Sequence, residues 1–508
     1  MENTFLNGLQ EKTNFTRTEN GAITHTTTNK GIFDMFAFGG AYRSRTDADC
    51  ITLFKEALAD DETLALKCLF YLRDVRGGQG ERRFFRVCYR WLCDYVPEVA
   101  KRNLEQISEY GRWDDLIYIA EGTKLEDYML FLIKEQIVLD LDCKTPSLLA
   151  KWMPSENASS YKTNALGNKI RQYLKMTHKD YRQMLSKLRT RINIVEKLMS
   201  ENRWDEIEFD KIPSKAGLKY KNAFARRDLI AKKYKEFVKD NTKKVNAKTL
   251  YPYDIAHEAF DWTMENKDIE DPDRMYLQKA WDNLPNYYGN KQENGIAVVD
   301  VSGSMSGQPM EAAVALGAYI AEKAHGPFAN HFITFSAKPD LIKFKGVDIV
   351  DKFNRAKRED WQMNTDIKAV FDLLLSTAMR EGTKREDMPD RLYIFSDMEF
   401  DDCVTFKGRQ EAAERWGYYG SRYVQDKNEM ETLMESIAKE WENVGYDLPQ
   451  LIFWNLAARQ DNIPMLKGAR FGYVSGFSPV MIEQILSGVD GWELCLKKLL
   501  SERYERIK

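Results

Sequence analysis

The sequence predicts an α + α/β protein, in which an N-terminal helical region precedes a doubly wound sheet with helices on both faces. Between about residues 47 and 284, apolar residues recur three or four positions apart and strand signals are almost absent. From about residue 291, apolar runs of strand length alternate with helical stretches. The most informative stretch is Gly295–Glu311, where an apolar run ends on Asp300 and a turn rich in Ser and Gly comes next.

Composition sets broad limits on the class of protein. The chain has 508 residues, 43% of them hydrophobic, which is enough for more than one core. Its net charge of -3 indicates no class of partner. The seven cysteines include no C-x-x-C pair, which favours reduced thiols and a cytoplasmic location. The N-terminus lacks the features of a signal peptide and no apolar run is long enough for a membrane span, so we expect no membrane association.

The first 45 residues are expected to be an extended segment with a short hairpin. Asn20-Gly21 lies between Thr-rich flanks, a typical hairpin signal. Residues 33–40 form an apolar patch that we expect to dock on the next part of the chain.

Residues 46–288 are predicted to form a helical domain. About ten short helices without a sharp repeat indicate an irregular α-solenoid of HEAT type. The expected helices are Ile51–Ala59, Glu62–Arg73, Arg82–Tyr95, Lys101–Glu109, Trp113–Ala120, Glu126–Leu141, Lys169–Met176, Asp180–Met199, Ala223–Lys239, Pro252–Met264 and Asp273–Asn283.

Residues 289–490 are predicted to form the sheet domain, and residues 491–508 a C-terminal helix. That helix, Trp492–Arg506, is amphipathic, so we expect it to pack back on the helical domain. The expected strands are Ile296–Val301, His331–Phe335, Leu341–Lys345 at an edge, Leu392–Phe395, Leu451–Asn455 and Gly472–Val474.

The turn after the first strand contains oxygen-bearing side chains that could bind a metal ion. Asp300, Ser302 and Ser304 offer one carboxylate and two hydroxyls, which are hard oxygen ligands that suit Mg²⁺. So few charges would leave the ion electrophilic and able to accept an acidic group from a partner. The alternative is a polar strand-to-helix turn without a metal.

This motif resembles the metal-ion-dependent adhesion site (MIDAS) of von Willebrand factor A (vWA) domains. The matching residues are D-V-S-G-S-M, starting at Asp300, after a hydrophobic strand. The vWA pattern also takes a Thr and an Asp from two later loops, and Thr365 and Asp397 stand in the expected order. The resemblance implies a Rossmann-like fold and a Mg²⁺ site, or one for Mn²⁺ or Ca²⁺, formed by Asp300, Ser302, Ser304, Thr365 and Asp397.

Three basic clusters in the helical part are candidate phosphate contacts. The first, R-D-V-R-G-G-Q-G-E-R-R, contains Arg73 and Arg76 but lacks the G-K-[ST] of a nucleotide-binding P-loop, so we expect no nucleotide cofactor. The alternative is an interhelical turn with Arg–Glu pairs.

Residues 211–250 hold 13 Lys and Arg against 3 Asp and Glu, which favours a polyanionic partner; the alternative is a solvated helical face. The other candidates are Lys169, Arg171, Lys175 and His178 in the second cluster, and Lys215, Lys219, Lys221, Arg226 and Arg227 in the third.

A helical region followed by a vWA domain resembles the Ro ribonucleoprotein (TROVE) family and its uncharacterised vWA-bearing relatives, to which residues 142–230 look closer. Tyr110–Leu116, Thr177–Arg182 and Phe395–Phe400 resemble local segments of Ro proteins. The resemblance implies a solenoid closed into a ring that binds single-stranded RNA ends and small structured RNAs. It implies RNA contacts by Lys169, Arg171 and His178. Asn364 departs from the Gly of the Ro pattern.

The sequence therefore favours a non-enzymatic RNA-binding scaffold with a metal-dependent ligand site. The alternative is a protein–protein adaptor whose metal captures an acidic residue of a partner. Metal-dependent hydrolysis is less favoured, because the motif supplies one metal and neither an evident nucleophile nor a general base.

Overall fold

The computed structural model describes residues 14–192, 194–289, 291, 294–335, 338–358, 366–401, 431–466, 470–489 and 491–508. The chain divides into two compact units, each assembled from separate stretches of sequence. Met1–Cys68 and Leu250–Glu502 form what we call the sheet unit, and Leu69–Thr249 and Arg503–Lys508 form the helical unit. This division differs from the boundary expected at residue 288, because residues 250–288 pack with the sheet.

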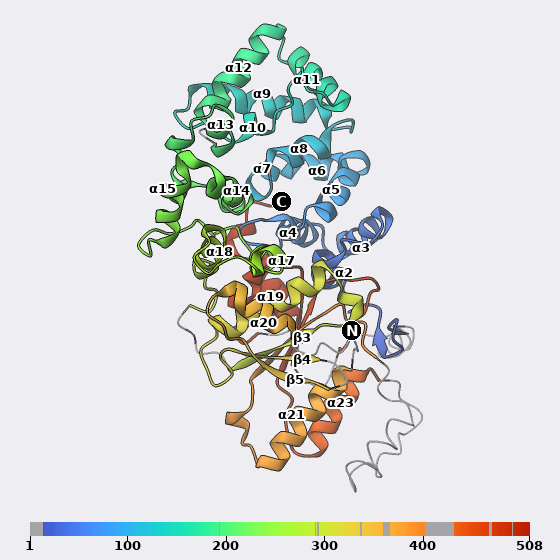
Figure 1. The fold of residues 1–508 in the computed structure, drawn as a ribbon. Helices are drawn as coiled ribbons and strands as arrows, with labels where there is room; N and C mark the ends of the chain where they lie inside the picture. Colours follow the sequence, from blue (N-terminus) through green and yellow to red (C-terminus); the bar gives the residue numbers. More distant parts are fainter. Residues whose placement is uncertain are drawn as a thin grey trace. The chain divides into compact units, whose positions relative to one another are not determined.

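The sheet unit is built on six strands in the order β5-β4-β3-β6-β7-β8 (Figure 1). All neighbours are parallel except β5, which pairs antiparallel with β4 at the edge. Each strand lies within a residue or two of its predicted position, and the central ones are buried along their whole length, as sheets covered on both faces require. The strands are β3 (Gly295–Asp300), β4 (His331–Phe335), β5 (Asp340–Lys343), β6 (Arg391–Ser396), β7 (Gln450–Asn455) and β8 (Phe471–Ser475). The mixed class, helical first and then a sheet, is confirmed.

Helices cover both faces of this sheet (Figure 1). On one face, α19 (Gln308–Lys323) packs on β3, β4 and β6. Its Gly317 permits this approach, because a Cβ there would lie 2.5 Å from Val299 Cγ2. On α19 packs α16 (Pro252–Ala259), and on α16 pack α17 (Trp262–Glu265), α18 (Pro272–Asp282) and α20 (Ile349–Arg358). The helices α21 (Ile367–Glu381) and α23 (Leu433–Asn443) lie on the other face.

The N-terminal part of the sheet unit corrects one prediction. β1 (Phe15–Arg17) and β2 (Ile23–His25) form the expected hairpin, with Gly21 at a φ of 96°. Residues 31–38, however, form helix α2 (Gly31–Phe38), so the expectation of an extended segment to residue 45 is wrong there. Because α2 is buried on every side from Ile32 to Phe38, it has no polar face and gives no helical periodicity. It packs on α3 (Asp47–Asp60), β7 and β8.

The C-terminal helix is shorter than expected. α25 (Gly491–Leu499) packs on β8 and α2 within the sheet unit, after the single turn α24 (Ile482–Ile485). A 3₁₀ turn, Glu502–Tyr504, comes after it. Only the last residues, Arg503–Lys508, belong to the helical unit.

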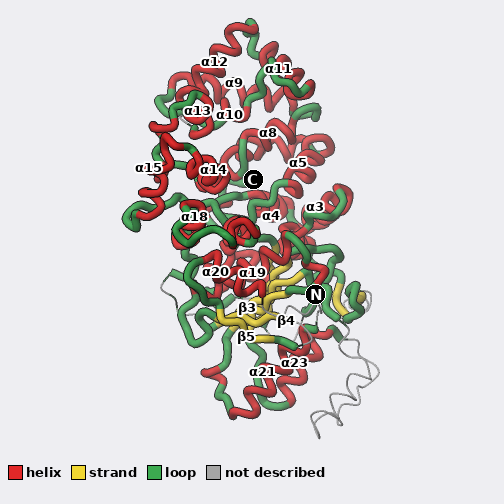
Figure 2. Tube along the Cα trace, viewed as in Figure 1, coloured by secondary structure: helices red, strands yellow, loops and turns green. Residues whose placement is uncertain are grey.

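The described part of the helical unit consists of helices, 3₁₀ turns and loops (Figure 2). Three expected helices of this unit are each divided: Lys101–Glu109 by a 3₁₀ turn, Asp180–Met199 after Arg191, and Ala223–Lys239 at Arg227, whose backbone is extended (φ -90°, ψ 109°). The helix α4 (Glu62–Arg73) crosses the boundary between the units. The others are α5 (Arg83–Tyr95), α6 (Pro97–Asn103), α7 (Ile107–Tyr110), α8 (Trp113–Ala120), α9 (Glu126–Asp142), α10 (Leu149–Trp152), α11 (Tyr161–Tyr173), α12 (His178–Arg191), α13 (Val195–Ser200), α14 (Ser214–Arg226) and α15 (Asp228–Lys239).

Candidate functional site

The carboxyl ends of β3 and β6 bring polar side chains together, as neighbouring parallel strands do. Asp300 ends β3 and is fully buried. Its Oδ1 accepts a hydrogen bond of 2.9 Å from the Ser302 amide, and its Oδ2 accepts one of 2.6 Å from Ser396 Oγ at the end of β6. The Oγ atoms of Ser302 and Ser304 lie 2.9 Å apart. The three residues predicted from the D-x-S-x-S turn therefore lie together.

Asp397 comes directly after β6 and lies close enough to influence Asp300. Burial, and then the charge of Asp397, raise the pKa of the Asp300 carboxyl to about 7. Asp397 is itself fully buried. Its Oδ1 accepts a hydrogen bond of 3.2 Å from the Glu399 amide, and its Oδ2 lies 3.0 Å from Arg459 Nη2. Two buried carboxylates thus share one edge of the sheet, with one guanidinium beside them.

The donor set has the chemistry that a hard cation takes. Asp300 and Asp397 supply carboxylate oxygens, and Ser302 and Ser304 supply hydroxyls, all without a nitrogen or sulfur ligand. Thr365, the fifth predicted ligand, lies outside the described residues. Within the described ranges, no group of three or more His, Cys, Asp or Glu is arranged to hold a metal ion. An ion at this edge would therefore depend on hydroxyl and water ligands as well as on the two carboxylates.

Sequence reasoning did not find the residues that surround Asp397. Glu399 is buried, and its Oε2 accepts a hydrogen bond of 2.7 Å from the Glu19 amide in the β1–β2 turn. Burial is the main reason that the pKa of Glu399 rises to about 7. Thr18 Oγ1 also donates to the carbonyl of Phe400, at 2.6 Å. The hairpin was predicted from Asn20-Gly21, but no local signal shows that it covers this loop.

The first basic cluster is structural at Arg73. This side chain is 2% exposed, and its Nη2 lies 2.5 Å from Asp115 Oδ2. Arg86 holds the other oxygen of Asp115 at 2.6 Å. Arg73 therefore adopts the alternative role, an interhelical turn held by Arg–carboxylate pairs. Arg76 is more than half exposed and lies 3.5 Å from Glu109.

The second cluster is organised around a buried carboxylate. Glu156 is 3% exposed; its Oε2 lies 3.3 Å from Arg171 Nε and 2.8 Å from His178 Nδ1, and its Oε1 lies 3.2 Å from Arg182 Nη1. Lys169 pairs with Glu126 at 3.0 Å. Lys175 is exposed, with a φ of 54°, just beyond the end of α11. Arg171 and His178 therefore share one carboxylate, and acidic groups already hold three of the four candidates.

The third cluster presents most of its charge to solvent. Lys215, Lys219, Arg226 and Arg227 are exposed on α14 and at its end. Lys221 differs, since it is 2% exposed and therefore lies within the unit. The aromatic residues interleaved with these cations pack inward: Phe224, Tyr234 and Phe237 surround Phe209.

Comparison with known proteins identifies relatives over nearly the whole chain. "Uncharacterized protein L728" of Acanthamoeba polyphaga mimivirus is 30% identical over 518 residues, covering 93% of this chain and 85% of the viral protein. The chain belongs to the same family as L728. Residues 18–121 and 147–287 match a domain of unknown function (DUF2828), and residues 294–495 match another (DUF7788). The residues that match DUF7788 include the carboxyl ends of β3 and β6. Among the described residues of the chain, no helix has the length and apolar character needed to cross a membrane.

Proposed function

We propose that this protein is a non-enzymatic adaptor with a vWA-type sheet domain, whose sheet edge holds one divalent cation and captures an acidic group of a protein partner. The observation that carries the proposal is the pairing of Asp300 and Asp397 at the ends of adjacent parallel strands, beside two serine hydroxyls. Buried carboxylates that repel each other are destabilised when ionised, and a divalent cation would offset that cost.

Asp300, Asp397, Ser302 and Ser304 would hold the ion. Mg²⁺, Mn²⁺ and Ca²⁺ all take oxygen ligands, and Mg²⁺ retains several waters. When bound, the ion supplies residual positive charge at an exchangeable position, which favours a carboxylate from a partner. Ser396 and the Ser302 amide would orient Asp300 by donating to its two oxygens, as they do here at 2.6 and 2.9 Å.

Calorimetric titration with MgCl₂ and MnCl₂ tests the proposal. Wild-type protein should bind one ion, and Asp300→Ala should abolish binding while leaving the circular dichroism spectrum unchanged. Asp387→Ala is the matched control, because this exposed aspartate lies in the same unit but precedes β6, away from the carboxyl ends of the strands. If the wild type binds no ion at millimolar concentration, the proposed metal site is rejected, together with the adaptor role that depends on it.

RNA binding by the helical unit is a second candidate, and the charge of residues 211–250 favours it. Their exposed cations outnumber their acidic residues, and their aromatic residues face inward. In this proposal the unit is a HEAT-like solenoid that binds RNA phosphates, as the resemblance to Ro proteins implies. The exposed basic residues are Lys211, Lys215, Lys219, Arg226, Arg227, Lys232, Lys233, Lys235, Lys239, Lys243, Lys244 and Lys248.

Filter binding of a short single strand and a hairpin over a salt series tests this candidate. Each phosphate contact should contribute about 0.7 to the logarithmic salt slope for single strands. The triple variant Lys219→Glu, Lys235→Glu, Lys243→Glu should weaken binding of both RNAs and flatten the slope. A double variant, Lys124→Glu and Lys187→Glu, reverses exposed lysines elsewhere in the same unit. Equal effects of the two variants would reject a specific basic surface.

A further inference from the structure

A pocket of about 500 Å³ opens in the helical unit, between α10, α12, α13 and the loop after α10. Four cationic side chains and three carboxylates line it, together with several hydroxyl groups. None of the lining residues belongs to the basic segment 211–250, so the role of the pocket is separate from the RNA binding proposed for that segment. It is also independent of the adaptor function, which uses the sheet unit.

Each carboxylate of this pocket already has a cationic partner. The three pairs, with N–O distances of 3.1, 3.2 and 3.4 Å, are Lys151–Glu196, Arg182–Glu156 and Lys197–Glu201. Glu156 and Glu201 also contact a second arginine each, Arg171 and Arg203. The acidic groups of the pocket are therefore compensated without its fourth cation.

That fourth cation, Arg189, is half-buried and is oriented by neutral acceptors. Its Nε donates to the carbonyl of Ala150 at 2.8 Å, its Nη2 to the carbonyl of Met153 at 2.7 Å, and its Nη1 to Ser155 Oγ at 3.0 Å. Among the residues that the structure describes, no carboxylate lies within ion-pair distance of this guanidinium, and burial lowers its pKa. The protein thus holds a positive charge in the pocket at a cost that an anion would offset.

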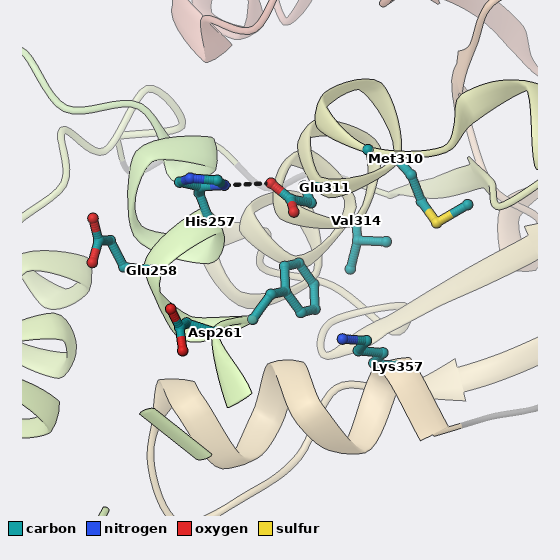
Figure 3. Close-up of a pocket in the computed structure, with 9 residues that line it drawn as sticks. His257, Glu258, Asp261, Met310, Glu311, Val314 and Lys357 are labelled. Carbon is teal, nitrogen blue, oxygen red and sulfur yellow. Dashed lines mark hydrogen bonds and ion pairs between the residues drawn. The ribbon is translucent and has the colours of Figure 1, made fainter. Parts of the chain in front are cut away.

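The pocket of the sheet unit that α16, α19 and α20 line differs in this respect (Figure 3). There, Glu311 Oε2 lies 2.7 Å from His257 Nδ1, and Asp261 Oδ1 accepts a hydrogen bond of 2.7 Å from the Thr263 amide at the start of α17. Those contacts account for the two carboxylates, whereas the charge of Arg189 has no counterpart in the described part of its unit.

Hydrogen-bond donors remain for a ligand around Arg189. Within the described ranges, its three hydrogen bonds use three of the five N–H groups of a guanidinium and leave two. Ser155 Oγ accepts from Arg189, so its own hydrogen can be donated. Ser186 lies one turn before Arg189 on α12 and also lines the pocket. Amide-like and hydroxyl donors beside one positive charge are what phosphate oxygens require.

We infer that this pocket binds a phosphate group, either as inorganic phosphate or on a small phosphate ester. Arg189 would donate to phosphate oxygens with its remaining N–H groups, since a planar guanidinium matches their geometry. Ser155 and Ser186 would donate to the same group. Leu185 and Ile194 also line the pocket and would contact the apolar part of an ester. A cation is disfavoured because it would meet Arg189, and a neutral molecule would leave that charge uncompensated.

Phosphorus NMR and calorimetry on the full chain test the inference with inorganic phosphate and glycerol 3-phosphate at constant ionic strength. Glycerol is the uncharged control probe, and a short RNA single strand is the competing polyanion. The tighter binder of the two phosphates identifies the ligand as the free ion or an ester. Failure of both to bind at millimolar concentration, or equal binding of glycerol, would overturn the inference. Displacement of both phosphates by a lower concentration of RNA would also overturn it, because the pocket would then be a nucleic-acid contact.

Variants locate the binding in this pocket. Arg189→Lys keeps the charge but loses the guanidinium fork, so it should weaken phosphate binding about tenfold. Ser186→Ala removes an exposed hydroxyl and should weaken binding about threefold. Glu196→Gln frees Lys151 from its ion pair and should strengthen binding about threefold. Lys187→Gln is the matched control, because this exposed lysine lies on the same helix and does not line the pocket.

Circular dichroism shows whether each variant is folded. Phosphate binding that is unchanged in both Ser186→Ala and Glu196→Gln would overturn the inference, and so would a loss in Lys187→Gln as large as that in Arg189→Lys. The serine and glutamate variants keep the inference testable even if the loss of the carbonyl contacts unfolds Arg189→Lys.

Discussion

Arg459 contacts Asp397 and Glu19 at the same time. Its Nη2 lies 3.0 Å from Asp397 Oδ2, and its Nη1 lies 3.2 Å from Glu19 Oε2. Asp397 is fully buried, whereas the Glu19 side chain is 39% exposed. The guanidinium therefore links the turn of the N-terminal hairpin to a carboxylate that the proposed cation would use, and the two positive charges would compete for it.

Arg459→Gln should make the metal-free protein less stable and its response to Mg²⁺ larger. The variant leaves Asp397 buried without its charged partner, which should cost about 1–3 kcal/mol of unfolding free energy. A divalent cation would then meet less competition, so the rise in melting temperature with MgCl₂ should exceed that of the wild type. Arg380→Gln changes an exposed arginine of the same unit and is the control. A variant whose melting temperature responds to Mg²⁺ no more than the wild type would contradict the competition.

The pH dependence of stability reports on Asp300. Its pKa is raised to about 7 in the folded chain by burial and by Asp397, so the folded state binds this proton more tightly than the unfolded state does. Without metal, the contribution of Asp300 to stability therefore falls as the pH rises from about 4 to 7. Asp300→Asn removes the charge, so it should be more stable than the metal-free wild type at pH 8.

The difference in unfolding free energy between the wild type and Asp300→Asn should shrink as the pH is lowered toward the ordinary pKa of an aspartate carboxyl. Urea denaturation in EDTA at several pH values, followed by circular dichroism, measures it. Saturating Mg²⁺ should stabilise the wild type and not the variant. A stability difference that is the same at every pH would mean that Asp300 titrates no differently in the folded and unfolded chains.

Some features could be predicted from sequence because their signal is local. The apolar run before Asp300, the proline at the start of α19 and the Asn20-Gly21 turn each specify their structure within a few residues. The same holds for the D-x-S-x-S turn. Helix α2 was missed because complete burial removes the polar face on which periodicity depends.

Other features depend on contacts between distant residues. Arg459 pairs with both Glu19 and Asp397, which lie far from it in the sequence, and nothing in their local sequence indicates this. The Gly-rich arginine motif resembled a phosphate site because Asp115, which holds Arg73, lies on another helix. The same explanation applies to the cluster around Glu156, because the cations that contact this carboxylate lie farther along the chain. Charge runs show where cations lie along the chain, but only the fold shows which carboxylates already hold them.

Arg73→Ala should unfold or strongly destabilise the helical unit. Asp115 is fully buried, and removing one of its two arginine partners leaves its charge poorly compensated, at a cost of about 3–5 kcal/mol. Arg76→Ala should change stability little, because that side chain is more than half exposed. Thermal unfolding compares the two variants. If Arg73→Ala were as stable as Arg76→Ala, the buried pair would not hold this turn, and a binding role for Arg73 would regain support.

The last residues of the chain should be needed to stabilise the helical unit. Tyr504 is fully buried, stacks on Tyr110 at 5.7 Å between ring centres, and its hydroxyl lies 3.1 Å from both Asp74 Oδ2 and the carbonyl of Gly77. Tyr504→Ala would leave a cavity and two acceptors without this donor, so it should lower the unfolding free energy by about 3–5 kcal/mol. Tyr504→Phe keeps the ring and should cost about 1–2 kcal/mol. Glu505→Ala is the control, because the neighbouring side chain is exposed. Urea denaturation of the full chain measures all three variants, and a loss for Tyr504→Ala no greater than that for Glu505→Ala would show that the C-terminal segment does not stabilise the unit.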